Sequence, residues 1–269
     1  MPEAEKAPMG AAVQVADPAG EDAALAALAR TAALAGAGTV TGAPQAALAI
    51  KTSELSRVYK VGPQDVQALR GVSLVVEAGS FVALKGRSGS GKTTLLNCVG
   101  GLDRPTAGSV SVFGRELAKM SERDLTHWRR EQVGFVFQSF ALLPTLSAFE
   151  NVELMPRMAG RGRRECNRRT ESSLDMVGLR KWMHHSPYEM SGGQQQRVAI
   201  ARALANGPKL ILADEPTGEL DSSTARDILS IFQRIVLEQH VTVLMVSHDS
   251  LVDEFADRVY HLADGQIVE

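Results

Sequence analysis

Residues 86–93 of this chain read Gly86-Arg87-Ser88-Gly89-Ser90-Gly91-Lys92-Thr93, and the segments on either side determine how this loop is interpreted. The apolar run 81–84 predicts a strand before the loop, and residues 93–99 predict a helix after it. Glycines in such a loop let backbone N–H groups approach an anion closely, and the positive end of the helix dipole faces the same point. The loop therefore predicts a site for the phosphates of a nucleoside triphosphate. The residues predicted to line this site are Gly86, Arg87, Ser88, Gly89, Ser90, Gly91, Lys92, Thr93 and Thr94.

Within that loop two side chains have predicted chemical roles. The Lys92 ammonium is expected to reach the β and γ oxygens of the triphosphate, and the Thr93 hydroxyl is expected to ligate Mg²⁺. Asp214 ends the apolar run 210–213, where a buried carboxylate is costly unless a cation such as Mg²⁺ accompanies it. Glu215, one residue further on, points elsewhere and is predicted to position or deprotonate the attacking water.

A second helix N-terminus is predicted at Ser191-Gly192-Gly193-Gln194, before a helix over 194–203. This N-terminus also suits an anion, yet it lies roughly 100 residues from the phosphate loop. One chain cannot easily close both sites on one phosphate, whereas a two-fold dimer can, because the loop of one copy then faces the Ser191 segment of the other. The sequence therefore predicts a head-to-tail dimer with ATP between the copies.

The predicted elements indicate an α/β fold with a mostly parallel core sheet, an antiparallel β subdomain and a helical subdomain. The near-continuous apolar runs 210–213 and 241–246 predict central parallel strands, and residues 258–268 predict a hairpin around Asp264-Gly265. Short strands are also predicted over 66–69, 72–76 and 81–84, the last two antiparallel across the turn 77–80. Residues 121–205 are predicted to be largely helical, from a capping start at Ser121.

The first 46 residues differ in composition from the domain predicted over 47–269. They are rich in Ala, Gly and Pro and contain no aromatic residue, which favours a disordered tail over a docked helix. The chain as a whole has a net charge of −2, so it presents no basic field and no nucleic-acid partner is expected. No apolar run approaches about 18 residues and the start lacks the pattern of a signal peptide, so a cytoplasmic location is expected.

From about residue 48 to 269 the chain resembles the ATPase subunit of an ATP-binding cassette (ABC) transporter. In that family Ser191-Gly192-Gly193-Gln194 corresponds to the signature motif, which contacts the nucleotide. The resemblance implies that Gln138 touches Mg²⁺ and the attacking water, that His248 contacts the γ-phosphate and that Tyr59 stacks on adenine. A plain edge-strand tyrosine is the alternative for Tyr59. The implied catalytic residues are Glu215, His248, Gln138 and Lys92, and the implied metal ligands are Thr93, Gln138 and Asp214.

The stretches 133–144 and 149–152 resemble the subgroup behind lipoprotein release, macrolide and peptide efflux, and cell division. This resemblance implies a separate membrane permease with few spans and a large extracytoplasmic domain, which would hold the ATPase at the inner face of the membrane. The alternatives are a soluble ABC ATPase acting on ribosomes or DNA, and the ATPase of an uptake transporter.

A run of six arginines lies within the predicted helical region. It is interpreted first as a solvated helix face, with a phospholipid or nucleic-acid patch as the alternative. Its members are Arg157, Arg161, Arg163, Arg164, Arg168 and Arg169.

Overall fold

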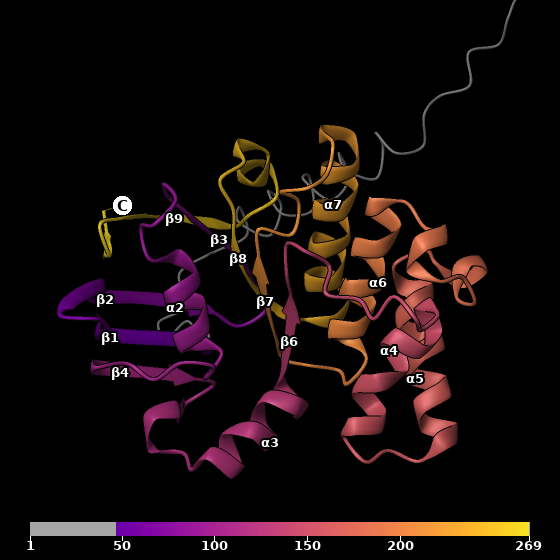
Figure 1. Cartoon of the computed structure of the whole chain (residues 1–269), viewed down its shortest axis with the longest axis horizontal. Coiled ribbons are helices and arrows are strands. Elements are labelled where there is room, and N and C mark those ends of the chain that lie inside the picture. The colour runs from indigo at the N-terminus through magenta and orange to yellow at the C-terminus, as the bar shows by residue number, and fades with distance from the viewer. Residues whose placement is uncertain (1–46, 269) are drawn as a thin grey trace, which may run out of the picture. The chain divides into compact units, whose positions relative to one another are not determined.

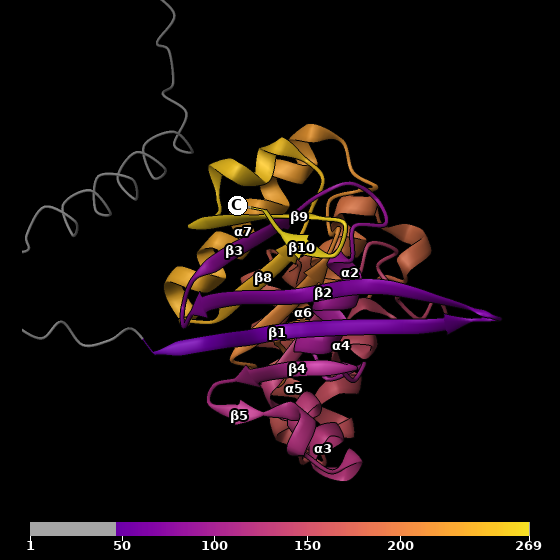
Figure 2. The same ribbon diagram turned by 90° about the vertical axis from the view of Figure 1, so that its left-hand side faces the viewer.

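The computed structural model describes residues 47–268, so the expected disorder of residues 1–46 lies outside the described residues. Two sheets organise these residues. The first has four antiparallel strands in the order β2-β1-β4-β5, which lie one below another in Figure 2. Its strands are β1 (Leu48–Val61), β2 (Gln64–Glu77), β4 (Ala107–Val112) and β5 (Arg115–Glu116).

The second sheet has six strands in the order β10-β9-β3-β8-β7-β6. All neighbours are parallel except β10, which pairs with β9 as an antiparallel hairpin around Asp264-Gly265. The predicted central strands and the C-terminal hairpin are therefore confirmed. The strands are β3 (Phe81–Lys85), β6 (Val133–Val136), β7 (Leu210–Asp214), β8 (Thr242–Val246), β9 (Arg258–Ala263) and β10 (Gln266–Ile267).

The predicted antiparallel hairpin across residues 77–80 is wrong. Residues 66–69 and 72–76 belong to one continuous strand, β2, which pairs with β1, whereas β3 lies in the other sheet, parallel to β8 and β9. Burial explains the difference: β2 alternates between buried and exposed residues in its second half, while Phe81–Leu84 are buried on both faces. The turn therefore carries the chain from a one-faced antiparallel sheet into a sheet that is covered on both sides.

Helices cover the six-stranded sheet, as Figure 1 shows. On one face, Phe81, Ile211 and Val243 point into a core formed with α4 to α7. On the other face, Val82 and Leu244 point into a core shared with α2 and the four-stranded sheet. The helices are α2 (Lys92–Val99), α3 (Glu122–Gln132), α4 (Ala148–Met158), α5 (Arg163–Met176), α6 (Gly192–Leu204) and α7 (Ser222–Gln239), and short 3₁₀ turns span Leu117–Lys119, Arg180–Trp182, Pro187–Glu189 and Ser250–Glu254.

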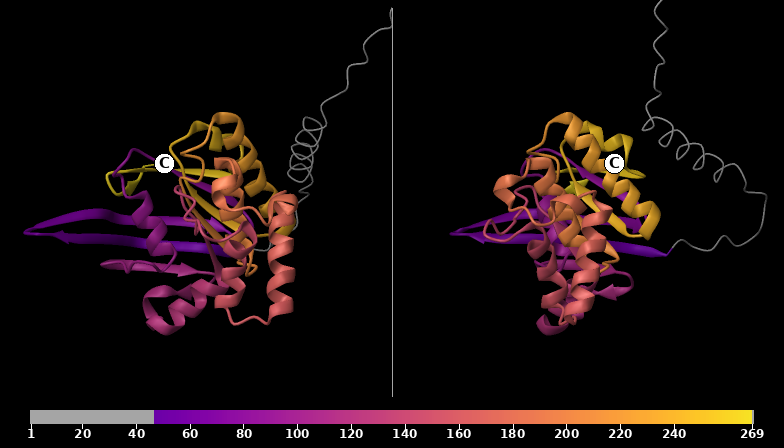
Figure 3. Two further views of the ribbon diagram at one scale, coloured as in Figure 1. Left: turned by 45° about the vertical axis from the view of Figure 1, so that its right-hand side comes forward. Right: turned by 90° about the vertical axis from the view of Figure 1, so that its right-hand side faces the viewer.

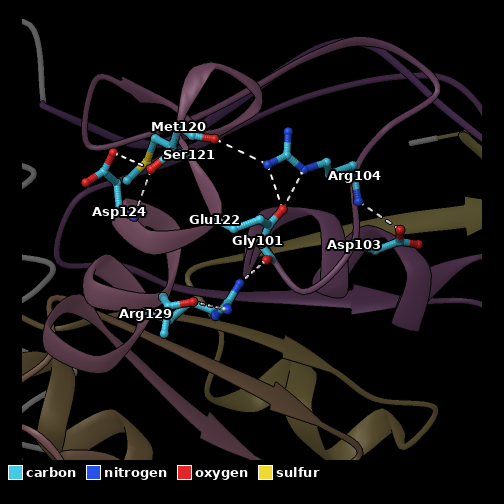
Figure 4. A network of polar contacts seen from close by, with 9 residues as sticks. Gly101, Asp103, Arg104, Met120, Ser121, Glu122, Asp124 and Arg129 are labelled. Atoms are coloured by element: carbon cyan, nitrogen blue, oxygen red, sulfur yellow. Dashed lines mark hydrogen bonds and ion pairs between the residues drawn. The ribbon is translucent and has the colours of Figure 1, made fainter.

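The range 121–205 contains α3 to α6, but it also contains β6, which the sequence did not predict. Ser121 caps α3 as predicted, because its hydroxyl accepts a hydrogen bond from the Asp124 amide. Further polar contacts tie α3 to the segment after α2 (Figure 4). In these contacts Arg104 pairs with Glu122 at 2.7 Å, and Arg129 donates to the Gly101 carbonyl.

No helix within residues 47–268 combines the length and the apolar character needed to cross a membrane.

Candidate active site

The phosphate loop runs from the end of β3 to the start of α2, and two of its glycines are required by their surroundings. A Cβ on Gly86 would lie 2.1 Å from the Leu262 carbonyl oxygen, and a Cβ on Gly91 would lie 2.4 Å from the Ala68 carbonyl oxygen. Gly91 also has φ 103°, a conformation that L residues rarely adopt. The loop therefore keeps its curvature only with glycine at these positions.

Lys92 is buried and its ammonium turns back into the loop. Nζ donates to the carbonyl oxygens of Gly86 at 2.8 Å and Arg87 at 3.0 Å. Within residues 47–268 no ion pair joins this ammonium to a carboxylate, and the buried Ser90 hydroxyl lacks a hydrogen-bond partner. A buried cation and an unsatisfied hydroxyl at a helix N-terminus suit a phosphate group.

Thr93 and Asp214 meet at the mouth of the loop. The Thr93 hydroxyl donates to Asp214 Oδ1 at 3.3 Å, which joins the first turn of α2 to the end of β7. Burial raises the pKa of the Asp214 carboxyl above its ordinary value and the Glu215 charge acts in the same direction, whereas the Thr93 hydrogen bond and the Lys92 charge lower it. A hydroxyl and a half-buried carboxylate side by side form an oxygen donor set that suits Mg²⁺.

Glu215 faces His248 rather than Asp214. Its Oε2 lies 3.2 Å from Nδ1 of His248, which follows β8. The Glu215 backbone has φ 48°, which is uncommon for a residue with a side chain, and its amide donates to the Val246 carbonyl at 2.9 Å. The left-handed turn therefore aims two consecutive carboxylates, Asp214 and Glu215, in different directions.

A hollow of about 400 Å³ lies in front of the Glu215–His248 pair. Its lining includes residues that the sequence interpretation missed and that carried no motif of their own. Ser247 is one of them, and its hydroxyl accepts a hydrogen bond from the Asp249 amide at 3.1 Å. The lining residues are Glu215, Thr217, Gly218, Leu220, Ser247, His248, Asp249 and Ser250.

Gln138 follows the end of β6 and is exposed. A Cβ built on Gly218 would meet its Nε2 at 3.2 Å, so the Gln138 amide lies against the turn that follows Glu215. The structure thus brings Gln138 to the same sheet edge as Asp214 and Glu215.

Tyr59 lies on β1 beyond the pairing with β4, which ends at Ser56, so at this position β1 pairs only with Val66 of β2. Its hydroxyl donates to Asp103 Oδ2 at 2.5 Å, and the Arg57 guanidinium lies 4.4 Å from its ring centroid. Arg57 also pairs with Asp103 at 2.8 Å. Burial raises the pKa of the Asp103 carboxyl, but hydrogen bonds from Tyr59 and Arg57 lower it further, so that the pKa lies below its ordinary value. Asp103 and Arg57 therefore contact Tyr59, although no sequence motif predicted either of them as part of the site.

The Ser191 segment caps α6. The Ser191 hydroxyl accepts from the Gln194 amide at 3.3 Å, and the Gln194 side chain accepts from the Ser191 amide at 2.9 Å, which is a complete capping box. A Cβ on Gly193 would lie 2.4 Å from Thr224 Cγ2, whereas a Cβ on Gly192 would meet only ordinary contacts. Within the described part of the chain, no hydrogen bond or ion pair joins this segment to the phosphate loop.

A family model described as ABC transporter matches residues 69–218. The chain belongs to the ABC transporter family.

Two relatives show what the chain is similar to. Over 217 residues the chain is 46% identical to the macrolide export ATP-binding/permease protein MacB of Rhodopirellula baltica, a match that covers 80% of this chain and 32% of that protein. Over 221 residues it is 44% identical to the lipoprotein-releasing system ATP-binding protein LolD 1 of Rhodopseudomonas palustris, which covers 81% of this chain and 97% of that protein. The chain thus spans about a third of the length of the MacB relative.

A solved structure of the ATP-binding cassette MJ0796, dimeric, in a post-hydrolysis state and bound to ADP and Pi, matches with a TM-score of 0.75. It is 42% identical, and the match covers 82% of this chain and 97% of that one. The predicted family and the predicted α/β cassette fold are confirmed, and so is the enzyme class, an ATPase.

Proposed function

We propose that this ABC ATPase powers a separate membrane permease of the lipoprotein-release or macrolide-export type. Its similarity to MacB and LolD 1 supports this subgroup. The permease would have few spans and a large extracytoplasmic domain, and it would hold the ATPase at the inner face of the membrane. The substrate would be selected by the permease.

In this proposal the phosphate loop holds the triphosphate. Lys92 would exchange the carbonyl oxygens of Gly86 and Arg87 for phosphate oxygens, which form stronger, charge-assisted hydrogen bonds. Tyr59 would present its ring to the adenine, held in place by Asp103 and Arg57. The remaining nucleotide contacts are assigned to Arg87, Ser88, Gly89, Ser90, Gly91 and Thr94 of the same loop and helix.

Thr93, Asp214 and Gln138 are the proposed ligands of Mg²⁺, which when bound would neutralise charge on the β and γ oxygens. Burial raises the pKa of the Asp214 carboxyl, and a bound Mg²⁺ would act in the opposite direction by favouring its ionised form.

Hydrolysis in this proposal depends on Glu215 and His248. Glu215 would accept a proton from a water molecule whose oxygen attacks the γ-phosphorus, while the bond to the β-phosphate oxygen breaks and ADP leaves. His248 would orient the Glu215 carboxylate and contact the γ-phosphate. The observation that carries this assignment is the 3.2 Å contact between Glu215 Oε2 and His248 Nδ1, beside the Thr93–Asp214 pair.

Ser191, Gly192, Gly193 and Gln194 are proposed to complete the ATP site of a second copy. The capped N-terminus of α6 offers free amides and a positive dipole end. Asp221, which caps α7, would lie near this interface. Hydrogen bonds from the Ser223 and Thr224 hydroxyls and amides hold the pKa of its carboxyl far below the ordinary value.

Purification of the full chain from detergent-solubilised membranes of its source tests the permease. We expect a membrane protein with few spans to copurify, and we expect that protein to change the ATPase rate when it is added back. Copurification with ribosomes or DNA alone would contradict the proposal and favour a soluble ABC ATPase.

A further inference from the structure

The arginine run is concentrated around the turn between α4 and α5, at the same end of the molecule as α3 (Figure 3). Residues 153–171 contain six arginines and three glutamates, although the whole chain has a net charge of −2. Nothing in the proposed ATP site uses these arginines.

Two contacts from α3 hold this turn in place. Arg130 donates from Nη1 to the Met158 carbonyl at 2.9 Å, and Arg161 pairs through Nη2 with Glu131 at 2.6 Å. The start of α3 is anchored by the Arg104–Glu122 pair drawn in Figure 4. The turn is therefore a supported surface, and its arginines are presented at defined positions.

A hollow of about 400 Å³ lies at this turn and is lined by three arginines and one glutamate. Arg157 is 66% exposed and makes only a long 3.4 Å contact with Glu153. Arg163 is exposed, and within residues 47–268 it makes no ion pair. It also occupies the first turn of α5, where the helix dipole disfavours a cation. The lining residues are Glu153, Arg157, Arg161, Arg163 and Cys166.

We propose that the turn between α4 and α5 contacts the anionic headgroups of a phospholipid bilayer, with Arg157 and Arg163 binding the headgroup phosphates. This inference rests on the proposed function, which brings the ATPase to a membrane through its permease. Met158, which directly follows Arg157 in the sequence, is 64% exposed. An exposed apolar residue next to arginines suits the membrane interface, where charge meets phosphate and the apolar group enters the headgroup boundary.

Single-stranded nucleic acid fits this surface less well. Residues 150–181 contain no aromatic side chain on which a base could stack.

The test is cosedimentation of the full chain with vesicles of phosphatidylcholine alone and with vesicles of an equal mixture of phosphatidylcholine and phosphatidylglycerol. We expect binding only to the mixed vesicles, and we expect it to be lost at roughly 0.5 M salt, where the Debye length is about 4 Å. Each arginine near an anionic surface contributes about fivefold to binding, so loss of two arginine charges weakens binding about 25-fold, and the double variant Arg157→Glu, Arg163→Glu, which reverses both charges, should bind at least about 25-fold more weakly.

The matched control is Lys51→Glu, Arg70→Glu, which changes the net charge equally on exposed strands of the four-stranded sheet. It should bind like the wild type. Equal loss in both double variants, equal binding to both vesicle types, or displacement by millimolar inorganic phosphate would overturn the proposal. Tighter binding to duplex DNA with the same arginine dependence would also overturn it.

The ATPase rate in vesicle-free solution separates this inference from the proposed function. Both double variants should hydrolyse ATP at the wild-type rate, because neither pair lies in the ATP site. If the wild type itself has no ATPase activity, the proposed function fails, whatever the vesicles show. If ATPase activity is normal and vesicle binding fails, only the membrane contact is wrong.

Discussion

Replacing Gly193 by alanine should destabilise the fold, although alanine is the better helix former. A Cβ at this position would lie 2.4 Å from Thr224 Cγ2, whereas carbon atoms pack best at about 3.5–4.0 Å. Thr224 cannot easily turn away, because it is β-branched and its hydroxyl donates to Asp221 Oδ2 at 2.6 Å. Overpacking of this kind costs about 1–3 kcal/mol, against an intrinsic gain of up to about 1 kcal/mol for Gly→Ala in a helix. After the full helix-propensity gain is subtracted, we therefore expect a net loss of roughly 0–2 kcal/mol of unfolding free energy, centred on about 1 kcal/mol.

The assay is a double-mutant cycle by denaturant unfolding. Thr224→Ser removes the clashing methyl group and keeps the hydroxyl for Asp221, so it should restore most of the stability that Gly193→Ala loses. Gly192→Ala is the matched control, because its Cβ would meet Leu220 Cδ2 at an ordinary 3.5 Å. Gly192→Ala should keep wild-type stability, but it should lower the ATPase rate if the Gly192 backbone approaches the phosphates of a second copy.

Two results would refute this reasoning. One is a Gly193→Ala protein as stable as the wild type, which would mean that α6 and α7 adjust without cost. The other is a loss of stability that Thr224→Ser does not relieve, which would place its cause elsewhere than in the contact with Thr224.

Three further predictions concern charged groups of the site. Lys92→Ala should weaken nucleotide binding roughly 10- to 100-fold in calorimetry, because charge-assisted hydrogen bonds to phosphate are lost; unchanged affinity would remove Lys92 from the phosphate site. Asp214→Asn should raise the melting temperature of the nucleotide-free protein at neutral pH while abolishing Mg²⁺-dependent turnover, because a carboxylate whose pKa is raised by burial destabilises the fold when ionised. That gain should vanish as the pH falls through the raised native pKa towards the ordinary value of about 3.9, and a gain that persists in acid would contradict the explanation. Asp103→Asn should cost up to about 1 kcal/mol at neutral pH by weakening the ion pair with Arg57. This deficit should shrink as the pH falls below about 3.9 through the depressed native pKa, and a deficit independent of pH would mean that the Asp103 charge is not its cause.

Much of the fold could be predicted because its strands differ in their patterns of burial. The runs at 210–213 and 241–246 are apolar throughout, which is typical of strands covered on both faces, and they became β7 and β8. The same pattern at 81–84 was misassigned, because the turn at 77–80 was interpreted as a hairpin. A turn specifies that the chain changes direction, but it does not specify which sheet the next strand joins.

The residues of the site also fall into two groups, those that the local sequence predicts and those that only the packing of the fold brings together. Roles for residues next to one another in sequence, such as the phosphate loop and Asp214-Glu215, could be predicted from their local context. Contacts between distant residues could not. Asp103 lies 44 residues from Tyr59, and the contact that requires Gly193 comes from Thr224 on another helix. Such pairs depend on how the sheets and helices pack, and no local pattern encodes that packing.

ATP turnover by the Glu215→Gln variant, measured together with nucleotide binding and dimer formation, tests the proposed hydrolysis mechanism. The amide keeps the shape of the side chain but cannot accept a proton from water. We expect wild-type affinity for Mg²⁺-ATP, no measurable turnover, and an ATP-bound dimer that accumulates on size-exclusion chromatography. Hydrolysis at the wild-type rate would contradict the assignment of Glu215 as the base, and with it the mechanism built on its contact with His248.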